Sequence, residues 1–194
     1  VVKDIDVKPK EALLHQEEGV DVIPSNLELS SMEVSLLNVM SREYVMKNVL
    51  KEVKDEYDYI LIDCMPSLGM LTVNALSCSD KVIIPVETGY LATKGMQQLL
   101  RTIKQIRTHT NPNLEVGGIL LTLVNKRTNL SKETIQDLKE TYGRAIKLYD
   151  TQIPLAVKTA ESTSRGKSIF KYDKNSKVAT AYEDFAKEVL EDDR

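Results

Sequence analysis

The chain has 194 residues, enough for one α/β domain with a sizeable core, and a formal net charge of −3, which argues against a generally basic nucleic-acid-binding protein. Its two cysteines, Cys64 and Cys78, have neither the spacing of a metal site nor a disulfide-rich context. No apolar run approaches the ~20 residues that span a bilayer, and no N-terminal segment resembles a secretion signal, so we expect a cytoplasmic protein.

Hydrophobic periodicity predicts the elements of the first half of the chain. We expect a short strand at residues 20–23, followed by helical segments over residues 29–40 and 44–49, where apolar side chains recur at helical spacing. The uninterrupted run at residues 59–62 predicts a strand that is buried on both faces, as in a parallel sheet. A short helix is expected at residues 71–76.

In the second half, strands alternate with longer helices. The predicted strands are residues 81–86, 119–124 and 146–149, and the predicted helices are residues 93–109, 131–142 and 178–189. Ser131 is expected to be the N-cap of its helix. This alternation predicts an α/β fold: a doubly wound, mostly parallel sheet with helices on both faces, in a single domain over residues 1–194.

The most informative stretch is residues 57–69, Tyr-Asp-Tyr-Ile-Leu-Ile-Asp-Cys-Met-Pro-Ser-Leu-Gly. Its apolar run stops at Asp63, and in open α/β sheets the ligand crevice lies at the carboxyl ends of the strands. A carboxylate there can hold a metal-bound water beside a phosphate, and the turn that follows offers backbone N–H groups. Many buried strands also end in a polar residue that only caps a turn, so this alternative stays open.

A phosphate-binding loop is not found in the sequence. Such a loop requires a Gly-rich turn followed by Lys and Ser or Thr, so that amides and an ammonium group surround the phosphates. Residues 166–168, Gly-Lys-Ser, have the final letters of this motif, but Glu161 stands where its first glycine belongs and no apolar strand precedes it. We interpret residues 166–168 as a loop.

Charge is unevenly distributed along the C-terminal part of the chain. Residues 158–177 contain six basic and two acidic side chains, whereas the last twelve residues contain six acidic and two basic ones. A basic stretch can bind nucleic-acid phosphates or can be a solvated loop, and charge alone leaves both interpretations open.

Together, four segments resemble the ParA/Soj branch of the deviant P-loop ATPases, whose relatives include MinD. They are residues 22–33, 57–76, 82–99 and 118–169, and their order and spacing match that family from about residue 20 to the C-terminus. The resemblance implies a DNA-partitioning ATPase that binds ATP and Mg²⁺, forms a nucleotide-dependent homodimer, binds DNA non-specifically and is stimulated by a ParB-like partner. It also implies a cytoplasmic, nucleoid-associated protein.

The resemblance also implies roles for individual residues. Asp63 matches the Walker B aspartate, which is catalytic and holds Mg²⁺ through water, and Pro66, Ser67 and Gly69 match the switch region that senses the γ-phosphate. Asn125 and Pro154 match positions that lie near the adenine in the family, although many relatives have Asp in place of this Asn.

Basic side chains are the next group for which the resemblance suggests a role. Arg165, Lys167 and Lys171 lie where the family's DNA-contacting surface tends to be. Arg127 is equally compatible with a structural ion pair and with a ligand contact. MinD-like proteins end in a basic helix that lies on membranes, whereas this chain ends in an acidic one, so we expect no membrane partner.

Some parts of the family pattern would precede residue 1, namely the P-loop, its signature lysine, the switch aspartate and a central strand. We therefore expect the chain to be a fragment or partial gene product that is poorly stable alone, or recruits a strand, and does not hydrolyse ATP by itself. Two alternatives stay open. One is a non-catalytic truncated paralogue that acts as a dimerisation or DNA-binding module, and the other is a MinD-like or reductase-type ATPase.

Overall fold

The computed structural model describes residues 8–65, 67–89 and 92–193, and its contacts divide the chain into two compact units. The N-terminal unit comprises the residues up to Asp80 together with Leu99–Leu114. The C-terminal unit comprises Lys81–Gln98 together with the residues from Glu115 onward. The single domain expected from the sequence stays a prediction.

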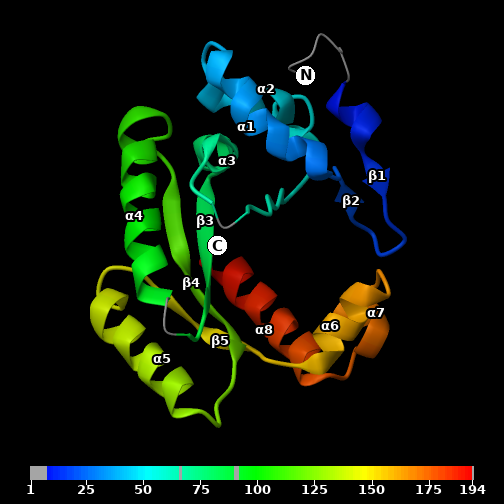
Figure 1. The fold of residues 1–194 in the computed structure, drawn as a ribbon. Coiled ribbons are helices and arrows are strands. Elements are labelled where there is room, and N and C mark those ends of the chain that lie inside the picture. The colour runs from blue at the N-terminus through cyan, green and yellow to red at the C-terminus, as the bar shows by residue number, and fades with distance from the viewer. Residues whose placement is uncertain (1–7, 66, 90–91, 194) are drawn as a thin grey trace. The chain divides into compact units, whose positions relative to one another are not determined.

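The C-terminal unit is built on a parallel three-stranded sheet (Figure 1). Strands β3 (Lys81–Glu87), β4 (Glu115–Val124) and β5 (Leu148–Pro154) lie in the order β3-β4-β5, and both neighbouring pairs are parallel. The strands predicted at residues 81–86 and 119–124 are confirmed. The third strand begins two residues later than predicted and extends to Pro154.

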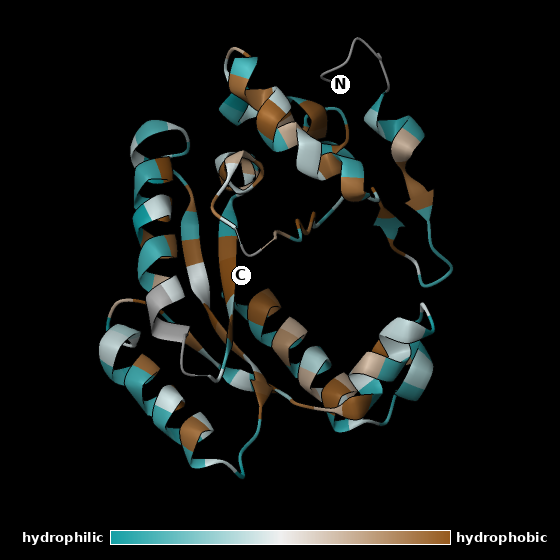
Figure 2. Cartoon of the chain, viewed as in Figure 1, coloured by the Kyte–Doolittle hydropathy of each residue, from teal (hydrophilic) through white to brown (hydrophobic). Residues whose placement is uncertain are grey.

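Helices α5 (Asn129–Tyr142) and α8 (Lys177–Asp192) lie on opposite sides of this sheet (Figure 1). Leu120 packs in one cluster with Tyr149 of β5 and Val178 of α8, whereas its neighbours Ile119 and Leu121 point to the other face and are 0% and 1% exposed. Figure 2 shows hydrophobic segments along the strands, and hydrophilic segments that alternate with hydrophobic ones along α5. The predicted doubly wound α/β architecture is confirmed.

Three further helices belong wholly or partly to this unit. Helix α4 (Ala92–His109) is confirmed as predicted, whereas α6 (Val157–Ser164) and α7 (Ile169–Asp173) were not expected from the sequence. The loop predicted at residues 166–168 is confirmed, because the chain leaves α6 in a turn and resumes helix at residue 169. Among the described residues, no helix combines the length and apolar character needed to cross a membrane.

The predicted N-cap of α5 is wrong. The cap is Thr128, whose backbone is extended and whose side chain accepts a hydrogen bond from the Ser131 amide at 3.3 Å. Ser131 lies inside the helix, where its hydroxyl shares a hydrogen bond with Thr88. The helix begins earlier because Thr128 also has the oxygen that an N-cap needs.

Apart from the part of α4 that begins at Leu99, the N-terminal unit consists of short elements. The strand expected at residues 20–23 is present as β2, and the helical segments predicted after it are confirmed as short turns of helix. The elements are η1 (Pro9–Ala12), β1 (Leu14–His15), β2 (Asp21–Val22), η2 (Leu27–Ser31), α1 (Met32–Ser35), η3 (Leu36–Asn38), η4 (Arg42–Tyr44), α2 (Val45–Leu50), η5 (Lys54–Glu56) and α3 (Met70–Cys78). Strands β1 and β2 form an antiparallel pair.

The strand predicted at residues 59–62 is wrong. These residues belong to neither sheet of the described chain, and Tyr59, Ile60 and Leu61 are 53%, 38% and 91% exposed. A strand requires neighbouring strands for its backbone N–H and C=O groups, and an apolar side chain is buried only when such a sheet packs against something. The described residues provide no partner strand for this run, so its hydrophobicity alone does not make it a strand.

Candidate functional site

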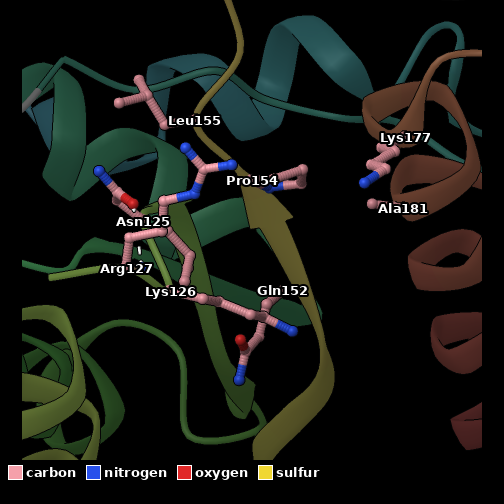
Figure 3. A pocket seen from close by; sticks show the side chains of 9 residues that line it. Asn125, Lys126, Arg127, Gln152, Pro154, Leu155, Lys177 and Ala181 are labelled. Atoms are coloured by element: carbon pink, nitrogen blue, oxygen red, sulfur yellow. Dashed lines mark hydrogen bonds between the residues drawn. The ribbon is translucent and has the colours of Figure 1, made fainter.

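A pocket of ≈600 Å³ lies at the carboxyl ends of β4 and β5 (Figure 3). It brings together Asn125 and Pro154, the two residues that the sequence predicted near an adenine. Its lining comes from the strand ends, the chain that follows them and the first turns of α8: Val124, Asn125, Lys126, Arg127, Gln152, Pro154, Leu155, Lys177 and Ala181. Ligand crevices of parallel α/β sheets lie at this same edge.

An irregularity at the end of β4 precedes this pocket. Leu123 has a φ of +50°, and the pairing of β4 with β5 shifts register between Leu121 and Val124. A bulge of this kind bends a strand and re-aims the side chains that follow it. The residues it redirects are those that line the pocket, beginning with Val124 and Asn125.

Asn125 is fixed by the turn that leads into α5. Its Oδ1 accepts a hydrogen bond from the Arg127 amide at 3.1 Å, and its carbonyl accepts from both the amide and the hydroxyl of Thr128, each at 3.1 Å. Its Nδ2 donates to no other group in the part of the chain that the structure describes. The side chain is therefore held in place while one amide donor stays available to a ligand.

Three cationic side chains line the same pocket, Lys126, Arg127 and Lys177, and no acidic side chain is among its lining residues. Figure 3 shows Lys177 on α8 facing the strand end that carries Pro154. Within the described ranges none of the three makes an ion pair, so the structural ion pair considered for Arg127 is not seen there.

Several other lysines of the C-terminal unit do have carboxylate partners. Lys81 pairs with Asp193, Lys147 with Asp192, and Lys158 with Asp173. The pocket lining contains three cations and no acidic side chain, so its field favours a negatively charged ligand.

The residues predicted to hold Mg²⁺ and to sense phosphate lie in the N-terminal unit. Asp63 is exposed, in the irregular segment that follows residues 59–62. Ser67 donates its amide to the Met65 carbonyl at 2.7 Å, and its carbonyl accepts from the Thr72 hydroxyl at 2.6 Å. Gly69 is the N-cap of α3, and Pro66 lies outside the described residues.

The two cysteines are close to this segment in sequence. Desolvation, followed by the charge of Asp63, raises the pKa of the Cys64 thiol. Burial raises the pKa of Cys78 to about 11. Both groups are therefore thiols at neutral pH, and a thiol is a weaker nucleophile than a thiolate. In the described ranges no cluster of three or more His, Cys, Asp or Glu side chains is arranged to hold a metal ion.

Asn74 anchors α3 and was not singled out as a site residue from the sequence. It is 2% exposed; its Oδ1 accepts from the Met46 amide at 3.0 Å, and its Nδ2 donates to the carbonyls of Arg42 at 2.8 Å and Met70 at 2.9 Å. A polar amide within the apolar run at residues 71–76 was the sequence signal for this role, because buried amides require partners.

The predicted DNA-contacting residues lie around the turn between α6 and α7. Arg165 and Lys167 lie in or next to the turn, Lys171 lies in α7, and all three are exposed. The Arg165 guanidinium lies 5.3 Å from the centre of the Tyr172 ring, a cation–π arrangement that orients its charge. The basic stretch is thus largely helical, with its cations at the surface, rather than a long solvated loop.

A parallel sheet between helices, with a cation-lined pocket at its carboxyl edge, places the chain in the class of α/β folds that bind ligands at the ends of their strands. Residues 2–116 match the AAA domain family. The chain is 45% identical over 172 residues to the sporulation initiation inhibitor protein Soj of Bacillus subtilis, covering 89% of this chain and 67% of Soj. It therefore belongs to the ParA/Soj family of partitioning ATPases.

Two further similarities agree with this assignment. The chromosome partitioning protein ParA of Caulobacter vibrioides is 38% identical over 178 residues, which cover 91% of this chain and 66% of that protein. The crystal structure of cobyrinic acid a,c-diamide synthase from Mycobacterium smegmatis with bound ATP analog and magnesium superposes with a TM-score of 0.73 at 37% identity, covering 78% of this chain and 61% of the other. The chain spans about two thirds of the length of the two curated relatives.

Proposed function

We propose that this chain is part of a DNA-partitioning ATPase that binds ATP and Mg²⁺ and couples the bound nucleotide to DNA. The observation that carries the proposal is the pocket at the carboxyl ends of β4 and β5, where Asn125 and Pro154 lie together beside three unpaired cations. The similarity to a synthase that binds an ATP analog and magnesium supports the same ligand class.

The donor set of the pocket fits a nucleotide. The ring of Pro154 offers an apolar surface to a base, and the free Nδ2 of Asn125 offers a donor to its edge. Lys126, Arg127 and Lys177 supply positive charge for phosphate groups. We propose that Asp63 holds the magnesium ion through water, and that Pro66, Ser67 and Gly69 respond to the terminal phosphate. A bound Mg²⁺ neutralises phosphate charge.

DNA is the second ligand that we propose, bound through its phosphates. Arg165, Lys167 and Lys171 are exposed basic side chains around one turn, and cations of this kind give sequence-independent, salt-sensitive affinity. Family membership supports a nucleotide-dependent homodimer, stimulation of hydrolysis by a ParB-like partner and association with the nucleoid as further parts of this proposal.

A fluorescent ATP analogue with Mg²⁺ tests the nucleotide site. Saturable binding by the 194-residue chain, weakened about tenfold or more in Asp63→Ala and Asn125→Ala, is the expected result. The matched control is Lys187→Ala, because Lys187 is an exposed cation on α8 that pairs with Glu183 of the same helix. A wild-type chain that stays folded by circular dichroism and binds no analogue would contradict the proposal and favour a non-catalytic binding module.

DNA binding is tested separately, with a short duplex and increasing salt. The double variant Arg165→Ala/Lys167→Ala removes two cations that we propose contact phosphates. It should bind every DNA sequence more weakly, and the slope of log affinity against log salt concentration should become shallower by about two. An unchanged salt slope would contradict the DNA role of this turn while leaving the nucleotide proposal intact.

A further inference from the structure

Glu33 of α1 caps the first turn of α3, far from it in sequence. Its Oε2 accepts a hydrogen bond from the Met70 amide at 2.6 Å, and its Oε1 accepts from the Leu71 amide at 3.1 Å. The first amides of a helix have no partner within the helix and carry the positive end of its dipole, so a carboxylate is favoured there by both hydrogen bonding and charge. Gly69, the N-cap itself, has no side chain to provide this cap.

The identity of residue 69 depends on this contact. A Cβ at position 69 would lie 2.5 Å from Oε1 and 2.6 Å from Oε2 of Glu33, far closer than van der Waals contact allows. Only glycine therefore lets the carboxylate reach the amides of Met70 and Leu71. The requirement for glycine here arises from close approach, since its backbone is extended, with a φ of −81°.

The contact connects two segments of the N-terminal unit. On one side, the Thr72 hydroxyl donates to the Ser67 carbonyl at 2.6 Å, which fixes α3 to the end of the loop that follows Asp63. On the other side, Glu33 belongs to the helical segment formed by η2, α1 and η3. Its two hydrogen bonds join that segment to the loop end at residues 69–71.

We propose that Glu33 is a positioning residue for nucleotide recognition. It holds residues 69–71 in place, so that the loop after Asp63 is presented to phosphate and Mg²⁺ in one arrangement. Glu33 itself touches neither ligand. The inference rests on the proposed function of residues 63–69 as the nucleotide-sensing loop, and it adds to that function a residue that sets the position of the loop.

Amide hydrogen exchange on the 194-residue chain tests the positioning directly and needs no nucleotide. In Glu33→Ala the amides of Met70 and Leu71 should exchange about tenfold faster than in the wild type. In Glu33→Gln, which keeps one acceptor oxygen, their exchange rates should increase less. Glu28→Ala, an exposed carboxylate in the same helical segment, should leave both rates unchanged. Unchanged rates in Glu33→Ala, or an equal increase throughout α3, would overturn the inference.

Gly69→Ala provides an independent variant. The added methyl should displace the Glu33 carboxylate and speed exchange at the same two amides, and this effect should disappear in a Glu33→Ala background, because nothing is left to displace. Additive effects of the two substitutions would contradict the coupling.

The nucleotide readout separates this inference from the proposed function. With Mg²⁺ present, Glu33→Ala should bind the fluorescent ATP analogue about tenfold more weakly, with partial rescue in Glu33→Gln and no change in Glu28→Ala. If the wild type binds and Glu33→Ala binds equally well, the inference fails and the proposed function stands. If the wild type does not bind, the proposed function fails before any variant is compared.

Discussion

Residues 59–62 and residues 119–121 are both apolar runs that predict a buried strand, but only the second run forms one. The second run lies in β4, which pairs with β3 on one side and β5 on the other and carries α5 and α8 over its two faces. The first run belongs to neither sheet, and Leu61 is 91% exposed. A strand therefore forms where neighbouring strands offer hydrogen-bond partners to its backbone N–H and C=O groups, and hydrophobic side chains add to its stability only then.

Identical substitutions in the two runs should have very different effects. Leu121 is 1% exposed, so Leu121→Ala leaves a cavity and should lower the free energy of unfolding by about 2–5 kcal/mol. Leu61→Ala should change it by no more than about 0.5 kcal/mol. Urea unfolding followed by circular dichroism gives both values, and similar losses in the two variants would mean that residues 59–62 are buried in solution.

A tight contact in the sheet gives the next largest effect. A Cβ on Gly118 would lie 2.8 Å from Cε2 of Tyr149 and 3.0 Å from the Lys147 carbonyl, so Gly118→Ala should cost about 1–3 kcal/mol of stability by forcing β4 and β5 apart. Gly95→Ala in α4 is the control, because nothing lies within 4 Å of its Cβ position. That change should be neutral or stabilising in the same unfolding experiment.

Ion pairs at the end of α8 should make the C-terminal unit sensitive to alkaline pH. Lys81 donates a hydrogen bond to Asp193, and Lys147 donates to Asp192; these bonds raise the pKa values of both lysines above 10.5. A raised lysine pKa contributes stability that is complete below about 10.5 and is lost as the pH rises through the folded-state value.

The measurement for these pairs is thermal unfolding between pH 9 and 12. Because the lysines are partly exposed, each pair should contribute about 0.2–1 kcal/mol, and Asp192→Asn should flatten the alkaline decrease in Tm. Parallel pH profiles for wild type and variant would show that the pair contributes nothing.

The smallest effect is expected at low pH, in the N-terminal unit. Hydrogen bonds from the Tyr57 hydroxyl at 2.6 Å, and then from His15, lower the pKa of Asp21 below 3.8. Its contribution is therefore present above about pH 3.8 and lost as the pH falls through the depressed value. Tyr57→Phe should raise the pKa of Asp21, which NMR titration of its carboxyl carbon measures, and an unmoved pKa would place the cause elsewhere.

The sequence predicted those features that local pattern controls. The alternation of apolar strands with amphipathic helices was enough to predict the parallel sheet. The family pattern predicted that Asn125 and Pro154 lie near an adenine; the structure places both in one pocket, and their contact with a base stays a prediction. The run at residues 59–62 was mispredicted because its fate depends on non-local partners. The capping of α3 by Glu33 was missed for a related reason, since no local pattern reveals a hydrogen bond between residues 37 positions apart.

Glu188 of α8 binds two consecutive amides of β5, Asp150 at 2.8 Å and Thr151 at 3.1 Å, on a strand whose only partner in the described sheet is β4. An open strand edge is a template on which other chains can add strands and aggregate. Glu188 also pairs with Lys147, and its carboxylate occupies two donors that an added strand could otherwise use. Helix α8 thus leaves fewer free donors on β5 for the addition of another strand.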